Sequence, residues 1–210
     1  MDILFSDNNL IVCIKPVGLD SEKQVPNELK STFGGEIFTV HRLDLNVSGV
    51  MVYARNKHTA STLSKAIQEG SMIKEYLATV HGKPNENGVL EDLLFKDSRK
   101  NKVFVVKRMR NGVKKAKLEY KRLTEGETSI VRIRLYTGRS HQIRVQFASR
   151  GYPLVGDHKY GSRSDKTAPM LFSCKLTFPY KKETVSFEAF PDWYTENPTS
   201  WLVGLFYAFL

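Results

Sequence analysis

Apolar and polar residues alternate along several short stretches of this chain, the pattern of half-buried β-strands. We expect strands over eight segments, namely Leu10 to Lys15, Val50 to Arg55, Lys74 to His81, Val103 to Arg110, Val113 to Leu123, Ser129 to Tyr136, Leu171 to Phe178 and Glu183 to Phe190. Many strands with few helices predict an α+β fold on a mixed, mainly antiparallel central sheet with flanking helices. Neither a repeat nor a low-complexity linker divides the 210 residues, so we expect a single domain.

Helical spacing of apolar residues appears in fewer places. We expect helices near Asn27 to Phe33, at Lys57 to Glu69 and at Arg139 to Arg150. Asn56 is placed to cap the start of the middle helix, and Gly70 its end. In the third helix the spacing puts His141 and Arg144 on one stripe, beside a separate stripe that faces the core.

Positive charge is concentrated in one region. The formal net charge is +10, and Lys96 to Lys117 holds ten Lys or Arg with Asp97 as its one acid, a balance of +9. Asn111-Gly112 lies inside this segment, and Asn-Gly between strand-like runs is a strong hairpin signal. We therefore predict a basic β-hairpin arm. Solvated charged faces usually mix both signs, so the excess of cations favours contact with a phosphate backbone. We assign this contact to three residues, Lys107, Arg108 and Arg110.

Candidate chemistry begins in the segment His41-Arg42-Leu43-Asp44. It precedes a Ser48-Gly49 turn and the expected strand from Val50, so its carboxylate sits on a loop between strands, where catalytic groups tend to lie. An isolated Arg-x-Asp is usually a surface ion pair or turn cap. Three later segments change that interpretation.

The later segments are a strand, a helix and a loop. The first is Lys74-Glu75-Tyr76, where Tyr76 shares a face with Ala78 and Val80 and is therefore partly buried. The second runs from Thr137 through Gly-Arg-Ser-His-Gln-Ile-Arg to Phe147, and the third is the glycine-punctuated stretch from Gly151 to Gly161, which contains Gly-Asp-His-Lys-Tyr-Gly.

Together these four segments resemble the motifs of the RluA-type pseudouridine synthases, enzymes that convert a uridine inside folded RNA into its C-glycoside isomer. The resemblance covers most of the chain and includes the family-like Lys15-Pro16 and Gly18 near its start. It implies the pseudouridine synthase fold, a long mixed sheet with its active site in a cleft across the middle. Val47 stands where the family commonly has Thr, and Gln146 where a His is common, which concerns substrate choice more than reaction type.

The resemblance assigns roles to individual residues. Asp44 corresponds to the catalytic aspartate, Arg144 to the arginine that pairs with it, and Tyr76 to the tyrosine beneath the target base, whose hydroxyl is placed to help remove the C5 proton. Attack at C1′, attack at the uracil ring and removal of the C2′ proton remain open as routes. Arg42 is expected to enter the space that the flipped nucleotide vacates.

Three further residues open the expected third helix, and we take them as candidates for binding a phosphate or the uracil edge, helped by the helix N-terminus. They are Arg139, His141 and Gln142. Packing or plain solvent exposure is the alternative for each of them.

Other site types find no support in the sequence. The five histidines lack zinc-ligand spacing, and the glycines match neither dinucleotide nor P-loop patterns, so we expect no metal and no cofactor. The start has no signal-peptide pattern and no apolar run approaches a membrane span, which predicts a cytoplasmic protein without membrane contact. The apolar segment 201–210 is half that length and is expected to pack on the domain or a neighbour. Because the catalytic motifs begin by residue 41, we expect no N-terminal S4-type domain of the kind frequent in this family.

The expected function is therefore isomerisation of specific uridines in structured RNA, ribosomal or transfer RNA, by a monomer. A glycosidase would need a second carboxylate spaced for acid-base work, and no acid pair recurs near the motifs. A non-catalytic RNA-binding protein that kept the fold is the better alternative. It would most simply have lost Asp44 or Arg144, and both are present.

Overall fold

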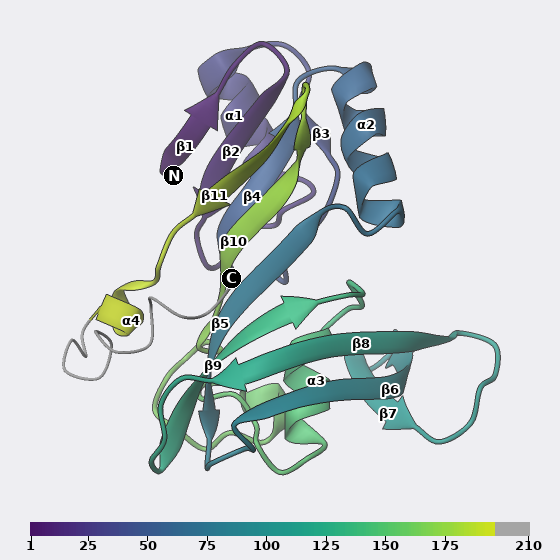
Figure 1. The fold of residues 1–210 in the computed structure, drawn as a ribbon, viewed down its shortest axis with the longest axis vertical. Helices are drawn as coiled ribbons and strands as arrows, with labels where there is room; N and C mark the ends of the chain where they lie inside the picture. Colours follow the sequence, from purple (N-terminus) through teal and green to yellow (C-terminus); the bar gives the residue numbers. More distant parts are fainter. Residues whose placement is uncertain (196–210) are drawn as a thin grey trace.

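The computed structural model describes residues 1–195, in which all strands belong to one sheet (Figure 1). The strands are β1 (Ile3–Ser6), β2 (Leu10–Lys15), β3 (Phe38–Thr39), β4 (Ser48–Ala54), β5 (Ile73–His81), β6 (Asn87–Asp97), β7 (Lys102–Val106), β8 (Val113–Arg122), β9 (Thr128–Leu135), β10 (Leu171–Tyr180) and β11 (Glu183–Glu188). The helices are α1 (Gln24–Phe33), α2 (Lys57–Gln68), α3 (Gln142–Ala148), the 3-10 turn η1 (His158–Tyr160) and α4 (Asp192–Thr195).

The strand order across the sheet is β1-β2-β4-β10-β5-β9-β8-β6-β7, with β11 on β10 and β3 on β4. Figure 1 shows β5 running between an upper group, from β1 to β10 and β11, and a lower group, from β9 to β7. Every pair of described strands is antiparallel except β10 with β4, which is parallel. The predicted mixed, mainly antiparallel α+β fold is thus confirmed.

Alternating side chains of the strands build a core on each face of the sheet, because successive residues of a strand point to opposite faces. In β4, Met51 and Tyr53 join the cluster that packs α1 and α3, whereas Val50 and Val52 face α2. Gly49, in the same strand, has φ +129°, and a Cβ there would overlap the backbone of Ser173. Glycine at this position lets β4 approach β10 closely enough to pair.

The predicted hairpin arm is wrong in its pairing. β7 and β8 are not neighbours, because β6 lies between them and forms an antiparallel ladder with each. The hairpin is instead β6–β7, and the segment 107–112 crosses back to the start of β8. Gly112 does adopt φ +79°, and the N–H of Val113 donates to the carbonyl of Arg110 at 3.0 Å. Asn111-Gly112 therefore makes a tight turn at the start of β8, but not one that joins paired strands.

Two other expectations need correction. The expected strand from Val103 ends at Val106, so Lys107, Arg108 and Arg110 lie in the loop after β7. The helix expected from Arg139 to Arg150 is shorter and runs from Gln142 to Ala148. His141, with φ +50°, precedes it as its N-cap residue and is not part of a helical stripe. The apolar segment 201–210 lies outside the described residues.

Candidate active site

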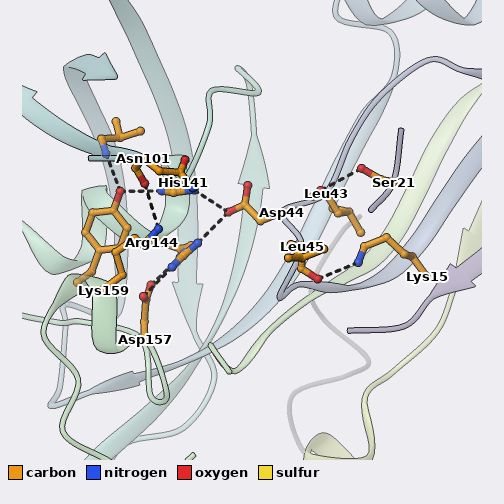
Figure 2. A network of polar contacts seen from close by, with 12 residues as sticks. Lys15, Ser21, Leu43, Asp44, Leu45, Asn101, His141, Arg144, Asp157 and Lys159 are labelled. Carbon is orange, nitrogen blue, oxygen red and sulfur yellow. Dashed lines mark hydrogen bonds and ion pairs between the residues drawn. The ribbon is translucent and has the colours of Figure 1, made fainter. Parts of the chain in front are cut away.

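The loop between β3 and β4 carries Asp44 and is held by the end of β2 and the segment that follows it (Figure 2). The hydroxyl of Ser21 donates to the carbonyl of Leu43 at 3.1 Å. The carbonyl of Leu45 accepts from the N–H of Gly18 at 2.9 Å and from the ammonium of Lys15 at 3.3 Å. Both carbonyls that flank Asp44 are thus anchored, which restricts the position of its carboxylate.

Lys15 is itself fully buried, and its ammonium donates to three carbonyls, those of Pro16, Leu19 and Leu45. Burial lowers its pKa to about 8, and the negative charge of Asp44 opposes the shift. The Lys15-Pro16 pattern noted in the sequence therefore marks a support for the Asp44 loop.

Arg144, from α3, joins two carboxylates. Its Nη1 lies 3.1 Å from Oδ2 of Asp44, as predicted. Its Nε and Nη2 donate to the two carboxylate oxygens of Asp157 at 2.7 and 2.8 Å, a bidentate pair that the sequence did not indicate. Burial alone would lower the pKa of the guanidinium, but Asp157 and then Asp44 outweigh it and raise the pKa above its ordinary value.

Asp157 lies in the loop 151–161 and is almost fully buried, with 1% of its surface exposed. The turn before it requires glycine, because Gly156 has φ +81° and a Cβ there would overlap the carbonyl of Ala168. The Gly-Asp-His-Lys-Tyr-Gly pattern was the available signal for this residue. Its role depends on a contact across the fold, which the pattern alone does not state.

Tyr160, from the same loop, connects the basic segment to the site. Its hydroxyl accepts the N–H of Val103 in β7 at 2.9 Å and lies 2.9 Å from Nδ1 of His141. Nε2 of His141 in turn lies 3.9 Å from the carboxylate of Asp44, and burial lowers the pKa of this histidine. Close by, the ammonium of Lys159 donates to the carbonyl of Asn101 (Figure 2). The basic segment 96–117 is therefore connected through Val103 to the surroundings of Asp44.

Tyr76 lies in β5 with 6% of its surface exposed, on the face that carries Ala78 and Val80, as predicted. Burial raises the pKa of its phenol, and a hydrogen bond with Ser173 opposes the shift only in part. Its hydroxyl is therefore protonated at neutral pH.

A cleft of about 740 Å³ lies over these residues. Seven of the predicted site residues line it: Arg42, Asp44, Tyr76, Arg139, His141, Gln142 and Arg144. The other three are exposed but do not line the cleft, namely Lys107, Arg108 and Arg110.

The polar groups of three cleft residues already have partners in the protein. Arg42 forms an exposed ion pair with Glu22 at 2.7 Å. The side-chain amide of Gln142 is engaged in the turn that precedes α3, where it bonds to Thr137, to the N–H of Arg139 and to the carbonyl of Lys117. Arg139 donates to a carbonyl of β8 and is otherwise exposed. Substrate contacts by these residues stay a prediction.

Within residues 1–195, no cluster of three or more His, Cys, Asp or Glu side chains is placed to hold a metal ion. The helices in this part of the chain are too short or too polar to cross a membrane.

Comparison with known proteins gives a consistent result. Residues 9–149 match the family described as RNA pseudouridylate synthase. Ribosomal large subunit pseudouridine synthase D of Borreliella burgdorferi is 34% identical, with 97% of this chain and 67% of the relative covered. Dual-specificity RNA pseudouridine synthase RluA of Vibrio parahaemolyticus is 33% identical, with 79% and 71% covered.

A solved structure also resembles this chain. Human RNA Pseudouridylate Synthase Domain Containing 1 superimposes with a TM-score of 0.78 at 25% identity, with 91% of this chain and 83% of that chain covered. The chain spans 66% and 63% of the length of two further curated relatives, from Mycoplasma pneumoniae and Aquifex aeolicus.

Proposed function

This chain belongs to the RNA pseudouridylate synthase family, and we propose on that premise that it isomerises uridine to pseudouridine in structured RNA. One observation carries the proposal. The carboxylate of Asp44 lies 3.1 Å from the buried guanidinium of Arg144, in a cleft that Tyr76 also lines. All three residues fall inside the range 9–149 that matches the family.

The reaction breaks the bond between N1 of uracil and C1′ of the ribose and forms a bond between C5 and C1′. The hydrogen on C5 is lost, N1 gains one, and the overall change is redox-neutral. Asp44 supplies the carboxylate that acts as nucleophile or as base toward the sugar, and Arg144 stabilises its charge and fixes its orientation. Because Asp157 anchors Arg144 through two further hydrogen bonds, the guanidinium is held before substrate arrives.

Tyr76 provides a flat ring on the same cleft, suited to stacking against uracil. Its hydroxyl, protonated in the free protein, must give up its proton before it accepts the hydrogen from C5. The proposed general-base step therefore requires a proton acceptor during turnover, and a solvent molecule or substrate group in the cleft would supply it.

Arg42 is proposed to occupy the space that the flipped nucleotide leaves, because it stands on the rim of the cleft two residues from Asp44. In the free protein it pairs with Glu22, and both side chains are about half exposed. An exposed ion pair of this kind contributes little to the free energy of folding, so RNA can displace Glu22 from Arg42 at a small cost in free energy.

The basic segment 96–117 supports an RNA substrate over a free nucleoside. β8 carries part of it and is connected to the cleft rim, since Arg139 donates to the carbonyl of Lys115 and Gln142 to that of Lys117. Positive charge thus continues from the cleft along β8 and the loop after β7, a distribution that suits several phosphates of a folded RNA. The name of the first relative makes ribosomal RNA of the large subunit the first substrate to test, and the dual specificity named for the second supports testing another class of folded RNA, transfer RNA, beside it.

The test measures release of the C5 hydrogen. Transcripts of large-subunit ribosomal RNA and of transfer RNAs, labelled with tritium at C5 of uridine, are incubated with the purified protein. We expect stoichiometric release at one or a few positions, matched by pseudouridines that disappear from cellular RNA when the gene is deleted. RNA binding without release from any of these transcripts would favour the non-catalytic alternative.

A further inference from the structure

Lys74 lines the cleft and has no part in the chemistry above. It precedes Tyr76 by two residues in β5, so both side chains are on the same face of the strand, and both line the cleft. Lys74 is half-buried, and burial lowers the pKa of its ammonium.

Most other cations of the cleft have a carboxylate partner. Arg144 has two, Arg42 pairs with Glu22, and Arg134 lies 3.7 Å from Glu119. Arg139 has none among the described residues, but it is exposed to water. Lys74 differs from all of these, because within residues 1–195 its ammonium makes no hydrogen bond and has no carboxylate oxygen within 4.0 Å. Removing a charge from water without pairing it is costly, so a ligand that supplies the missing partner would bind here favourably.

Two neighbours of this ammonium, Gly138 and His41, bring no negative charge to it. A Cβ added to Gly138 would lie 3.2 Å from Nζ of Lys74, so the backbone of the 137–139 turn passes close to the ammonium and a side chain there would crowd it. His41 is neutral, since burial and then the charge of Lys74 lower its pKa to about 3. Its Nε2 accepts the N–H of Val52. Within the described residues the buried Nδ1 of His41 has no partner.

We propose that Lys74 binds a phosphodiester of the RNA substrate, at or next to the nucleotide whose base lies over Tyr76. This rests on the proposed function for the position of the base. Two residues of strand separate the side chains by about 6.6 Å, which limits the bound group to that nucleotide or its direct neighbour. Lysine binds phosphate as a point charge and needs no second donor in fixed geometry.

The test uses single-stranded oligouridylate of eight nucleotides, which enters the cleft without base flipping. Affinity is measured at several salt concentrations for the wild type, Lys74→Met and Lys74→Arg, with Lys182→Met as a control at an exposed lysine on the β10–β11 turn. For Lys74→Met we expect weaker binding and a slope of log affinity against log salt that is smaller by about 0.7, the value for one phosphate on a single strand. Lys74→Arg should keep the slope, and the control should leave it unchanged.

A measurement of stability distinguishes phosphate binding by Lys74 from a role of this residue in stabilising the fold. Because Lys74→Met removes an unpaired, half-buried charge, urea unfolding should show equal or greater stability than in the wild type. Lower stability together with an unchanged salt slope would overturn the proposal, as would weaker binding with an unchanged slope, which indicates a contact to uracil.

The two proposals fail independently. Binding of oligouridylate does not require turnover, so a reduced slope in Lys74→Met supports the phosphate subsite even if no transcript releases its C5 hydrogen. Conversely, turnover by the wild type with an unchanged slope in Lys74→Met rejects the subsite and leaves the synthase activity intact.

Discussion

Arg144 contacts Asp44 through one nitrogen only, Nη1, at 3.1 Å from Oδ2. The other carboxylate oxygen of Asp44 has no protein donor among the described residues, and 19% of the side chain is exposed toward the cleft. Nε and Nη2 of the guanidinium each donate to a carboxylate oxygen of the buried Asp157. One carboxylate therefore anchors the arginine, and the other is oriented by it and left open to substrate.

The anchoring carboxylate leads to a prediction about stability. Asp157→Asn leaves the buried guanidinium of Arg144 without its main charged partner, and breaking a buried pair in this way costs about 3 kcal/mol. Urea unfolding should show this loss, and turnover should fall because Arg144 is no longer fixed. Asp165→Asn, at an exposed site in the same region, is the control and should change stability by less than about 0.5 kcal/mol. Equal stability of the two variants would show that Arg144 does not depend on Asp157.

The neutral histidine beside Lys74 leads to a prediction about pH. Burial and then the charge of Lys74 lower the pKa of His41 from its ordinary value near 6.5 to about 3, so the unfolded state binds more protons between these values. The stabilisation from neutral His41 is complete above pH 6.5. Below that pH the free energy of unfolding falls by up to about 1.4 kcal/mol per pH unit. His41→Gln can still accept the N–H of Val52 and should show a shallower decline in urea unfolding between pH 7 and 5. If both proteins lose stability in parallel, His41 titrates normally in the fold.

Tyr76 allows ring and hydroxyl to be tested separately. Tyr76→Phe keeps the ring, so RNA affinity should change by less than about twofold, whereas C5 hydrogen release should slow by about 10²-fold or more if the hydroxyl acts as a base. Tyr76→Leu removes the ring as well and should also weaken binding, by about 1 to 3 kcal/mol for one stacked base. Wild-type turnover by Tyr76→Phe would leave stacking as the role of this residue.

The loop after β7 is tested by salt dependence. Changing Lys107, Arg108 and Arg110 together to Gln should weaken binding of folded RNA and reduce the slope of log affinity against log salt by about 2 to 3, because fewer counterions are released. Lys181→Gln with Lys182→Gln removes charge from the β10–β11 turn and should barely alter the slope. A triple variant with the wild-type slope would remove this loop from the RNA-binding surface.

Sequence patterns predicted the fold well where each strand alternates clearly. β2 has the predicted bounds, and β5 differs by one residue. β6 was missed because Asn87-Gly88 and Glu91-Asp92 are poor strand formers, although pairing on both sides stabilises it. That omission also produced the wrong hairpin, since an Asn-Gly turn does not reveal whether the adjacent strands are neighbours.

The candidate site was likewise predicted only in part. The pairing of Asp44 with Arg144 was predicted from the motifs and is confirmed by the contact between them. The contacts of Asp157 and Tyr160 and the unpaired ammonium of Lys74 were not predicted, because each depends on which loops and strands meet in three dimensions. Only the structure shows that Asp157 is buried against Arg144, that Tyr160 bonds to Val103, and that Lys74 is half-buried in the cleft.

Asp44→Asn tests the central claim most directly. The change is nearly isosteric and removes the charge, so the anchored loop and the cleft should keep their shape while Arg144 loses its second carboxylate. RNA affinity, measured by filter binding, should fall only modestly. Release of the C5 hydrogen should fall by more than the roughly 10²- to 10⁴-fold typical of losing an acid-base group. Release at the native rate by Asp44→Asn would contradict the assignment of synthase chemistry to this site.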